Sequence, residues 1–295
     1  MTVKIKNDIL TAEIDLYGGK LISLAAQDGT EYIWRDTSSY WPDRACLLFP
    51  TSGRLYGGMY THKGRSYRMP LHGFAYTSKF TISEIGVSSV TLSLKDNSHT
   101  LETYPFRFDF SVKYELSGNT LRSVFSVKNT GEETMFFALG FHPWFNVPTD
   151  KRLSFSDCRA EFPDAEEINI CRMSENVLDS GKRIPLGGKI INLNPSLFSD
   201  DVIILEGTGG KLHIDCGQGG GITVGYEGMP YLGLWNTAIK DVRFLCAEPM
   251  TSLPGREGIT EELSGRRDIV SLEAGKTYET EVTVTADASE NRGVS

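Results

Sequence analysis

The sequence lacks the features that stabilise small secreted proteins. Its cysteines are five, an odd number with irregular spacing and no C-x-x-C pair, so a disulfide framework and a structural zinc site are both unexpected. It has no N-x-[ST] glycosylation acceptor, because the one partial match, Asn194-Pro195-Ser196, contains proline. These absences favour a reducing compartment, and we predict the cytoplasm.

Long apolar runs and clusters of positive charge are also missing. The first ten residues, MTVKIKNDIL, hold no apolar core of signal-peptide length, and no later segment is apolar enough to cross a bilayer. The net charge is −8 and no Lys/Arg run occurs, which argues against a nucleic-acid surface. We therefore expect a small-molecule ligand, with neither nucleic acid nor membrane as a partner.

Helical periodicity is scarce, and a period of two dominates. Apolar residues alternate over 106–116, the chain turns at Ser117-Gly118-Asn119, and the alternation resumes over 121–127, which predicts a long antiparallel hairpin. Similar runs recur along the whole chain without a linker rich in Pro, Gly or Ser. The pattern predicts an all-β protein: one large antiparallel β-sandwich over 1–285 with few short helices, and a polar tail over 286–295. The best helix candidate is Ser174 to Asp179.

One carboxylate stands out from this pattern. In FLCAEPM, Phe244, Cys246 and Glu248 share one face of a predicted strand, because side chains alternate across a sheet. Glu248 therefore points where apolar residues point. A buried carboxylate is costly unless it has a partner or a function, so Glu248 is the strongest single candidate for a site residue.

Other reactive side chains also lie among apolar neighbours. Each alone fits a structural role at least as well as a functional one, but together they predict an acid–base pocket. The candidates are Arg54 in LLFPTSGRL, His72 in PLHGFA, His142 in ALGFHPWFNVP, Asp200 or Asp201 in FSDDVIILEG, and Trp235 in MPYLGLWNTA.

Metal, cofactor and thiol chemistry have weaker support. The chain has no closely spaced histidine or carboxylate ligands on one element, so we predict no metal and no other cofactor. A nucleophilic Cys246 paired with a histidine is conceivable, but nothing in the local sequence marks that thiol as activated.

The ordered motifs SGRL, PLHGFA, GFHPWFNVP, DDVIIL, YLGLWN and CAEPMTSLPG resemble those of the aldose 1-epimerase (galactose mutarotase) superfamily, in particular its bacterial LacX-like branch. The resemblance extends from about Ile14 to Val284. It implies the galactose mutarotase-like supersandwich and an enzyme that interconverts the α and β anomers of an aldose without a cofactor. The expected substrate is a hexose or a related sugar, free or phosphorylated.

The resemblance also implies a role for each candidate. Glu248 matches the general base and His142 the general acid, while His72 matches the histidine that bonds near the sugar's ring oxygen. Arg54 and Asp201 match groups that bind hydroxyls, with Asp200 as the alternative to Asp201. Trp144 stands where galactose mutarotases proper carry a tyrosine, which leaves the sugar open, and we expect Trp235 or Trp144 to cover a sugar face.

Three alternatives remain at this stage. A sugar sensor of the same fold would bind without turnover, and a hexose 6-phosphate mutarotase would need a phosphate subsite, for which Arg35, Arg44 and Arg54 form a candidate cluster. A glycoside hydrolase would use Glu248 with Asp201 as its carboxylate pair, but it leaves both histidines unexplained.

Overall fold

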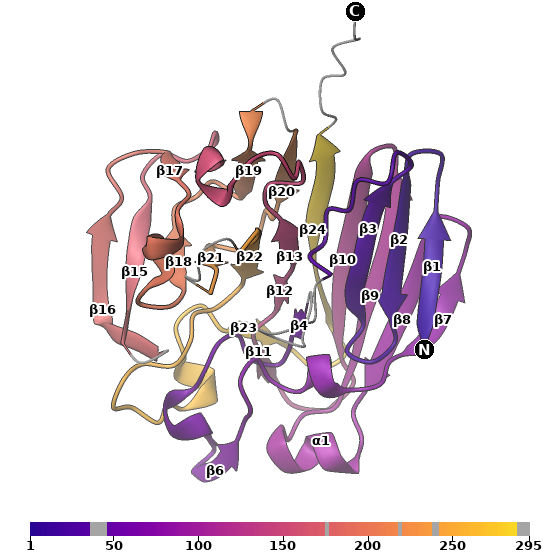
Figure 1. The fold of residues 1–295 in the computed structure, drawn as a ribbon. Helices are drawn as coiled ribbons and strands as arrows, with labels where there is room; N and C mark the ends of the chain where they lie inside the picture. The colour runs from indigo at the N-terminus through magenta and orange to yellow at the C-terminus, as the bar shows by residue number, and fades with distance from the viewer. Residues whose placement is uncertain (36–45, 175–176, 218–219, 238–241, 288–295) are drawn as a thin grey trace, which may run out of the picture.

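The fold is made almost entirely of antiparallel strands (Figure 1). The computed structural model describes residues 1–35, 46–174, 177–217, 220–237 and 242–287. Within these residues, two large sheets and three small ones account for all the named strands. The prediction of an all-β sandwich with few short helices is confirmed.

The larger sheet has nine strands and runs across the back of the molecule as drawn in Figure 1. In spatial order its strands are β17 (Ile190–Asn192), β14 (Arg159–Glu161), β19 (Lys211–Asp215), β20 (Gly221–Gly225), β24 (Thr277–Asp287), β10 (Thr120–Asn129), β9 (Phe108–Ser117), β8 (Ser89–Lys95) and β7 (Thr81–Ile85). It contains the predicted hairpin, in which Leu121 pairs with Leu116 across the turn. The buried residues of β9 alternate strictly with less buried ones, as the period of two requires.

The second large sheet has eight strands and positions the site. In spatial order its strands are β16 (Val177–Pro185), β15 (Asn169–Ser174), β18 (Ile203–Glu206), β21 (Tyr231–Trp235), β22 (Phe244–Met250), β12 (Gly140–His142) and β4 (Cys46–Leu48), and β13 (Trp144–Asn146) also pairs with β22. One face of this sheet packs on the nine-stranded sheet. Leu232 and Leu245 on that face share one apolar cluster with Phe110 and Val284 of the larger sheet.

The remaining elements are short. The small sheets are β1 (Thr2–Lys6), β2 (Leu10–Asp15) and β3 (Lys20–Ala26); β5 (Met59–His62) and β6 (Arg65–Arg68); and β11 (Met135–Phe137) and β23 (Val270–Leu272). The 3₁₀ turns are η1 (Tyr56–Gly58), η2 (Ala75–Thr77), η3 (Phe155–Asp157), η4 (Pro195–Phe198) and η6 (Leu263–Gly265). No helix in the described part of the chain is long and apolar enough to span a membrane.

The predicted helix at Ser174 to Asp179 is wrong. Residues 175–176 lie outside the described ones, and the flanking residues belong to β15 and β16, where Met173 pairs with Leu178. A segment this short gains too little from helical hydrogen bonds to compete with such a hairpin. The α-helix that does form is α1 (Ser98–Thr103), which begins at an Asn97–Thr100 capping box.

The structure also contains a disulfide, between Cys158 and Cys216. The cysteine spacing gave no sign of it, because the two residues are 58 positions apart in the sequence. They meet because β14 pairs with β19 so that Arg159 faces Asp215, which places the two adjoining cysteines opposite each other with Cα atoms 4.2 Å apart. The other three cysteines, Cys46, Cys171 and Cys246, are free and buried.

The C-terminal strand reaches slightly further than the predicted domain. β24 ends at Asp287, two residues into the segment predicted as a polar tail, and it pairs with both β10 and β20 at the centre of the nine-stranded sheet. Residues 288–295 lie outside the described part of the chain.

Candidate active site

The candidate site lies on the face of the eight-stranded sheet that points away from the core. Along β22, Leu245 and Ala247 belong to the core cluster, whereas Phe244, Cys246 and Met250 belong to separate clusters on the other face. Glu248 shares this second face, as the period of two predicted. It faces Gly233 of β21, where an added Cβ would lie 3.4 Å from the Glu248 carboxylate, so glycine leaves room for that group.

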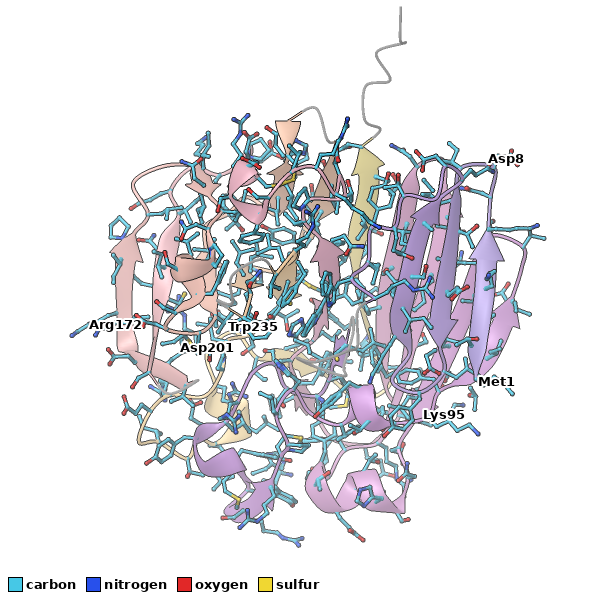
Figure 2. The ribbon with its side chains drawn as sticks, viewed as in Figure 1. Met1, Asp8, Lys95, Arg172, Asp201 and Trp235 are labelled. Atoms are coloured by element: carbon cyan, nitrogen blue, oxygen red, sulfur yellow. A yellow bond between two sulfur atoms is a disulfide. The ribbon has the colours of Figure 1, made fainter. Side chains whose placement is uncertain are left out.

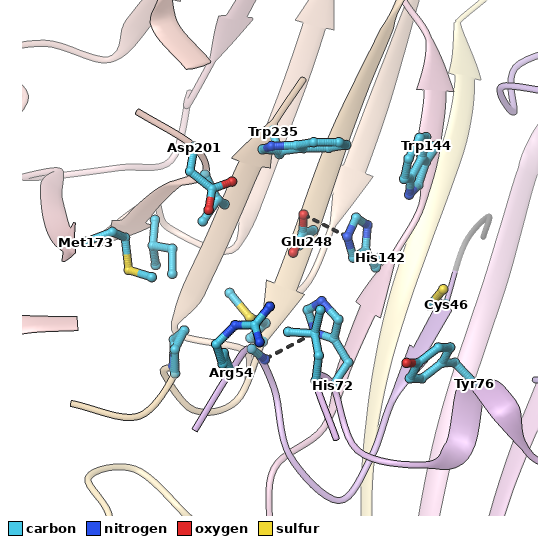
Figure 3. Close-up of a pocket in the computed structure, with 16 residues that line it drawn as sticks. Cys46, Arg54, His72, Tyr76, His142, Trp144, Met173, Asp201, Trp235 and Glu248 are labelled. Atoms are coloured by element: carbon cyan, nitrogen blue, oxygen red, sulfur yellow. Dashed lines mark hydrogen bonds and ion pairs between the residues drawn. The ribbon is translucent and has the colours of Figure 1, made fainter. Parts of the chain in front are cut away.

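His142 is the partner of Glu248. It ends β12, which lies between β22 and β4, and its Nε2 is 3.0 Å from Oε1 of Glu248 (Figure 3). Both side chains are nearly buried, with 12% of the His142 side chain and 7% of the Glu248 side chain exposed. An imidazole and a carboxyl group at this distance share a hydrogen bond and can pass one proton between them.

His72 is held by the backbone next to this pair. The Nδ1 atom of its imidazole accepts a hydrogen bond of 3.1 Å from the backbone N–H of Gly53. The backbone N–H of His72 in turn donates to the Gly53 carbonyl oxygen at 3.0 Å. Because a backbone N–H can only donate, Nδ1 carries no proton, and the proton of the neutral imidazole lies on Nε2. The rings of His72 and His142 are 5.5 Å apart, so His72 adds a second imidazole beside the pair.

The backbone at His72-Gly73 is unusual. Both residues have positive φ, at 62° and 77°, and a Cβ on Gly73 would lie 2.2 Å from the Phe49 carbonyl oxygen. We expect Gly73→Ala to lower the free energy of unfolding by about 2 kcal/mol or more, because it adds a backbone clash to an unfavourable φ. Thermal unfolding would measure this as a fall in Tm of about 4 °C.

Gly118→Ala is the matched control for this substitution. Gly118 also has positive φ, at 55°, but an added Cβ meets nothing within 4 Å. We expect a loss of about 1 kcal/mol there, from the left-handed conformation alone. Equal losses at both positions would show that the close approach to Phe49 has no energetic weight.

Arg54 and Asp201 line the same cavity, close enough for the charge of Arg54 to act on the Asp201 carboxyl group. Figure 2 shows Asp201 and Trp235 side by side, to the left of the centre in that view, and Figure 3 shows the Trp235 nitrogen on the Asp201 side. Burial raises the pKa of Asp201, and hydrogen bonds from the Val202 backbone and Trp235, together with the charge of Arg54, oppose that rise. Asp201 lines the cavity, whereas Asp200 is exposed and does not, which favours Asp201 of the two candidates.

The cavity has a volume of about 340 Å³, which suits one small ligand. All seven candidates from the sequence line it: Arg54, His72, His142, Trp144, Asp201, Trp235 and Glu248. Sequence reasoning missed the rest of the lining: Cys46, Gly53, Leu71, Tyr76, Met173, Val202, Ile204, Met250 and Pro254. Met250 could have been found from its place two residues after Glu248 in the same strand, but Cys46 reaches the site only through the β4–β12 pairing.

Burial drives the histidines and Glu248 toward their neutral forms. It raises the pKa of Glu248 to about 8, with a further contribution from the Asp201 charge. It lowers the pKa of His142 well below the usual value, helped by His72, and lowers the pKa of His72 to about 4, helped by Arg54. Near neutral pH the His142–Glu248 pair therefore holds one proton in total, while His72 is a neutral donor through Nε2.

Comparison with known proteins identifies the family. A profile of the aldose 1-epimerase family matches residues 1–285. The chain belongs to the aldose 1-epimerase family. Protein LacX of Lactococcus lactis is 34% identical over 265 residues, covering 86% of this chain and 88% of LacX, which confirms the predicted branch of the family.

Solved structures of family relatives share the whole fold. A galactose mutarotase related enzyme from Lactobacillus acidophilus has a TM-score of 0.92 at 30% identity, covering 99% of both chains. A galactose mutarotase-like protein from Lactobacillus casei has a TM-score of 0.91 at 27% identity, covering 97% of this chain and all of that one. The supersandwich predicted from the sequence is thus confirmed.

This aldose 1-epimerase family member also brings one thiol close to the acid–base pair. Ligand atoms of His142, Cys246 and Glu248 all lie within 4.8 Å of one another, a spacing that a metal ion could bridge. The Cys246 thiol is fully buried, and burial together with Glu248 raises its pKa well above the usual value. The thiol is therefore held in its protonated form, which is a poor metal ligand and a poor nucleophile.

Proposed function

We propose that the protein is a mutarotase that interconverts the α and β anomers of an aldose by acid–base ring opening and closure. The observation that carries the proposal is the nearly buried His142–Glu248 pair, with 3.0 Å between Nε2 and Oε1, on the wall of the cavity. Ring opening needs one group to take the proton of the anomeric hydroxyl and another to protonate the ring oxygen. A pair that shares one proton supplies both functions.

The proton inventory of the pair fits both directions of the reaction. Burial favours the shared proton on Glu248. Once that proton has passed across the hydrogen bond to His142, Glu248 is the base for the anomeric hydroxyl, and His142 is the acid for the ring oxygen. After rotation of the open-chain aldehyde, each group reverses its role and the ring closes on the other face. Each group contributes about 10²–10⁴-fold to the rate. His72 donates through Nε2 to the same end of the sugar, as its hydrogen bond from Gly53 allows.

The other polar residues hold the ring in place. Arg54 offers a fork of donors and Asp201 offers acceptors, which together suit neighbouring sugar hydroxyls. Trp235 is half-buried and lines the same cavity, so we assign it the sugar face. Fixing the ring in this way aligns both proton transfers with the His142–Glu248 pair.

The pair sets the expected pH dependence. The active form holds one proton, and that proton is lost as the pH rises through the Glu248 pKa of about 8. We expect kcat/KM to be level below that pH and to fall about tenfold per pH unit above it. Anomer exchange measured by NMR, corrected for the spontaneous reaction, would give the profile. A rate that keeps rising above pH 9 would mean that the fully deprotonated site is the active one.

Asp201→Asn offers a check on this profile. The Asp201 charge contributes to the raised pKa of Glu248, so its removal should move the fall in kcat/KM to lower pH. The position of the fall is read separately from the overall rate, which also changes because Asp201 is a proposed hydroxyl ligand.

Polarimetry on freshly dissolved α-glucose and α-galactose tests the activity, and NMR extends the test to other free and phosphorylated aldoses. Acceleration of at least one aldose is the expected result. Sugar binding by calorimetry without acceleration across the panel would identify a sensor instead. Arg54 is the only cationic residue lining the cavity within the described part of the chain, and Arg44 lies outside that part, so we propose a free aldose as substrate.

A further inference from the structure

We propose that Trp144 recognises the sugar through its indole N–H, as a hydrogen-bond donor that selects for one hydroxyl, and not through its aromatic face. This inference rests on the proposed function and assigns a specificity-determining residue to the same site. It also changes the expectation from the sequence, in which Trp144 was a candidate wall for a sugar face.

Both faces of the Trp144 ring are already covered. Phe244 stacks at 4.8 Å between ring centroids with 22° between the planes, and His142 stacks at 5.9 Å with 23° between the planes. The Trp235 ring packs edge-on against the Trp144 ring, with 5.5 Å between centroids and 65° between the planes. A sugar therefore has no free Trp144 face on which to stack, and only an edge of the indole is available to the cavity that Trp144 lines.

The indole nitrogen of Trp144 is an unpaired donor within the described part of the chain. Trp144 is 3% exposed, and its Nε1 is buried without a hydrogen-bond partner among the described residues. Figure 3 shows the nitrogen at the end of the ring nearest the histidines. Leaving a buried N–H unpaired is costly, whereas a ligand oxygen at this position would satisfy it.

Trp235 shows the contrast. Its indole nitrogen lies on the Asp201 side (Figure 3), where it lowers the pKa of that carboxyl group, and its side chain is only half-buried. The two tryptophans of the cavity thus have different proposed roles: Trp235 offers an aromatic face to the sugar, and Trp144 offers a hydrogen-bond donor.

The position of Trp144 indicates which hydroxyl of the sugar accepts its hydrogen bond. Its ring lies against His142, which handles the anomeric and ring oxygens in the proposed mechanism. The acceptor is therefore a hydroxyl next to the reacting end of the sugar. In a hexose this is the hydroxyl on C2, beside the anomeric carbon, or the hydroxyl on C6, the exocyclic carbon attached to the ring carbon that bears the ring oxygen.

The test combines Trp144→Phe with deoxy sugars. Phenylalanine keeps a ring between His142 and Phe244 but has no donor, so we expect kcat/KM on the parent aldose to fall about 10–100-fold. The 2-deoxy and 6-deoxy aldoses lack one candidate hydroxyl each. On the sugar without the hydroxyl that Trp144 binds, wild type and Trp144→Phe should show equal kcat/KM, while the other deoxy sugar keeps the full difference.

Trp34→Phe is the matched control. Trp34 packs on the same Phe244 ring, at 5.5 Å between centroids, but does not line the cavity. We expect near-wild-type kcat/KM on all three sugars. The pH at which kcat/KM falls should also stay unchanged in Trp144→Phe, because the His142–Glu248 pair is retained.

Two results would overturn the inference. One is an unchanged kcat/KM for Trp144→Phe on the parent aldose, and the other is the same loss on all three sugars, which would show a packing role alone. If wild type accelerates no sugar, the proposed activity fails separately. Calorimetric titration with the same three sugars then decides the role of Trp144, with the affinities of wild type and Trp144→Phe compared in place of kcat/KM.

Discussion

Glu248→Gln should lower the mutarotation rate by about 10²–10⁴-fold while leaving the fold intact. The amide has nearly the shape of the carboxyl group and can still bond Nε2 of His142, but it cannot take the proton of an anomeric hydroxyl. NMR exchange rates on the sugar that wild type accelerates most would measure the loss.

Glu206→Gln is the control for this substitution. Glu206 lies on β18 of the same sheet, one strand beyond β21, pairs with Arg183 at 2.6 Å and does not line the cavity. It should keep the wild-type rate. A Glu248→Gln enzyme that also kept the wild-type rate would remove Glu248 from the mechanism.

The Glu248→Gln variant should be more stable than wild type in alkaline solution. The Glu248 pKa rises from an ordinary value of 4.5 to about 8 on folding, so the folded state holds this proton more tightly than the unfolded state. Wild type therefore loses stability as the pH rises from about 4.5 to 8, whereas glutamine has no proton to lose. The Tm difference should be near zero at pH 5 and largest at pH 8 and above, so loss of activity and gain of stability would appear together.

His142→Ala should have an equally large effect on the rate. It removes the proposed acid and leaves Glu248 without its partner, so we expect a loss of about 10²–10⁴-fold. Because the two groups act as a unit, the double variant with Glu248→Gln should lose little beyond either single variant. Polarimetry at matched enzyme concentrations would measure all three.

A second histidine and added imidazole complete this experiment. His213→Ala alters β19 of the other sheet, where His213 contacts Thr223 outside the cavity, and should keep the wild-type rate. Imidazole in solution should restore part of the rate to His142→Ala but none to the double variant. The rate of the double variant with imidazole also gives the correction for catalysis by free imidazole. Wild-type rates in His142→Ala would contradict the assigned acid.

The sheet-level features were predictable because they depend on local alternation. The hairpin of β9 and β10 and the face that Glu248 shares with Phe244 and Cys246 both follow from a period of two over a few residues, whereas the period did not show that this face points away from the core. Glu248 was notable for the same reason: a carboxylate on an apolar face conflicts with the cost of burying charge. The motifs of the family then supplied partners that no local pattern could connect.

The features that the sequence did not reveal depend on pairings between distant segments. Cys158 meets Cys216 only through the register of β14 and β19, and Cys46 reaches His142 only through β4 and β12. The covered faces of Trp144 follow likewise from the β13–β22 pairing, which aligns Trp144 with Cys246. No periodicity within one segment carries information about which strand will lie beside it.

The order of strands in the eight-stranded sheet has a consequence for how the protein acquires activity. β4, β12, β21 and β22 each bring one part of the cavity, yet they come from positions as far apart as residues 46 and 250. Closing such long loops is slow, so these contacts form late in the search for the native state. The proposed catalytic centre is then an assembly that no fragment of the chain holds by itself, and recovery of the proposed mutarotase activity during refolding would report the arrival of the complete fold.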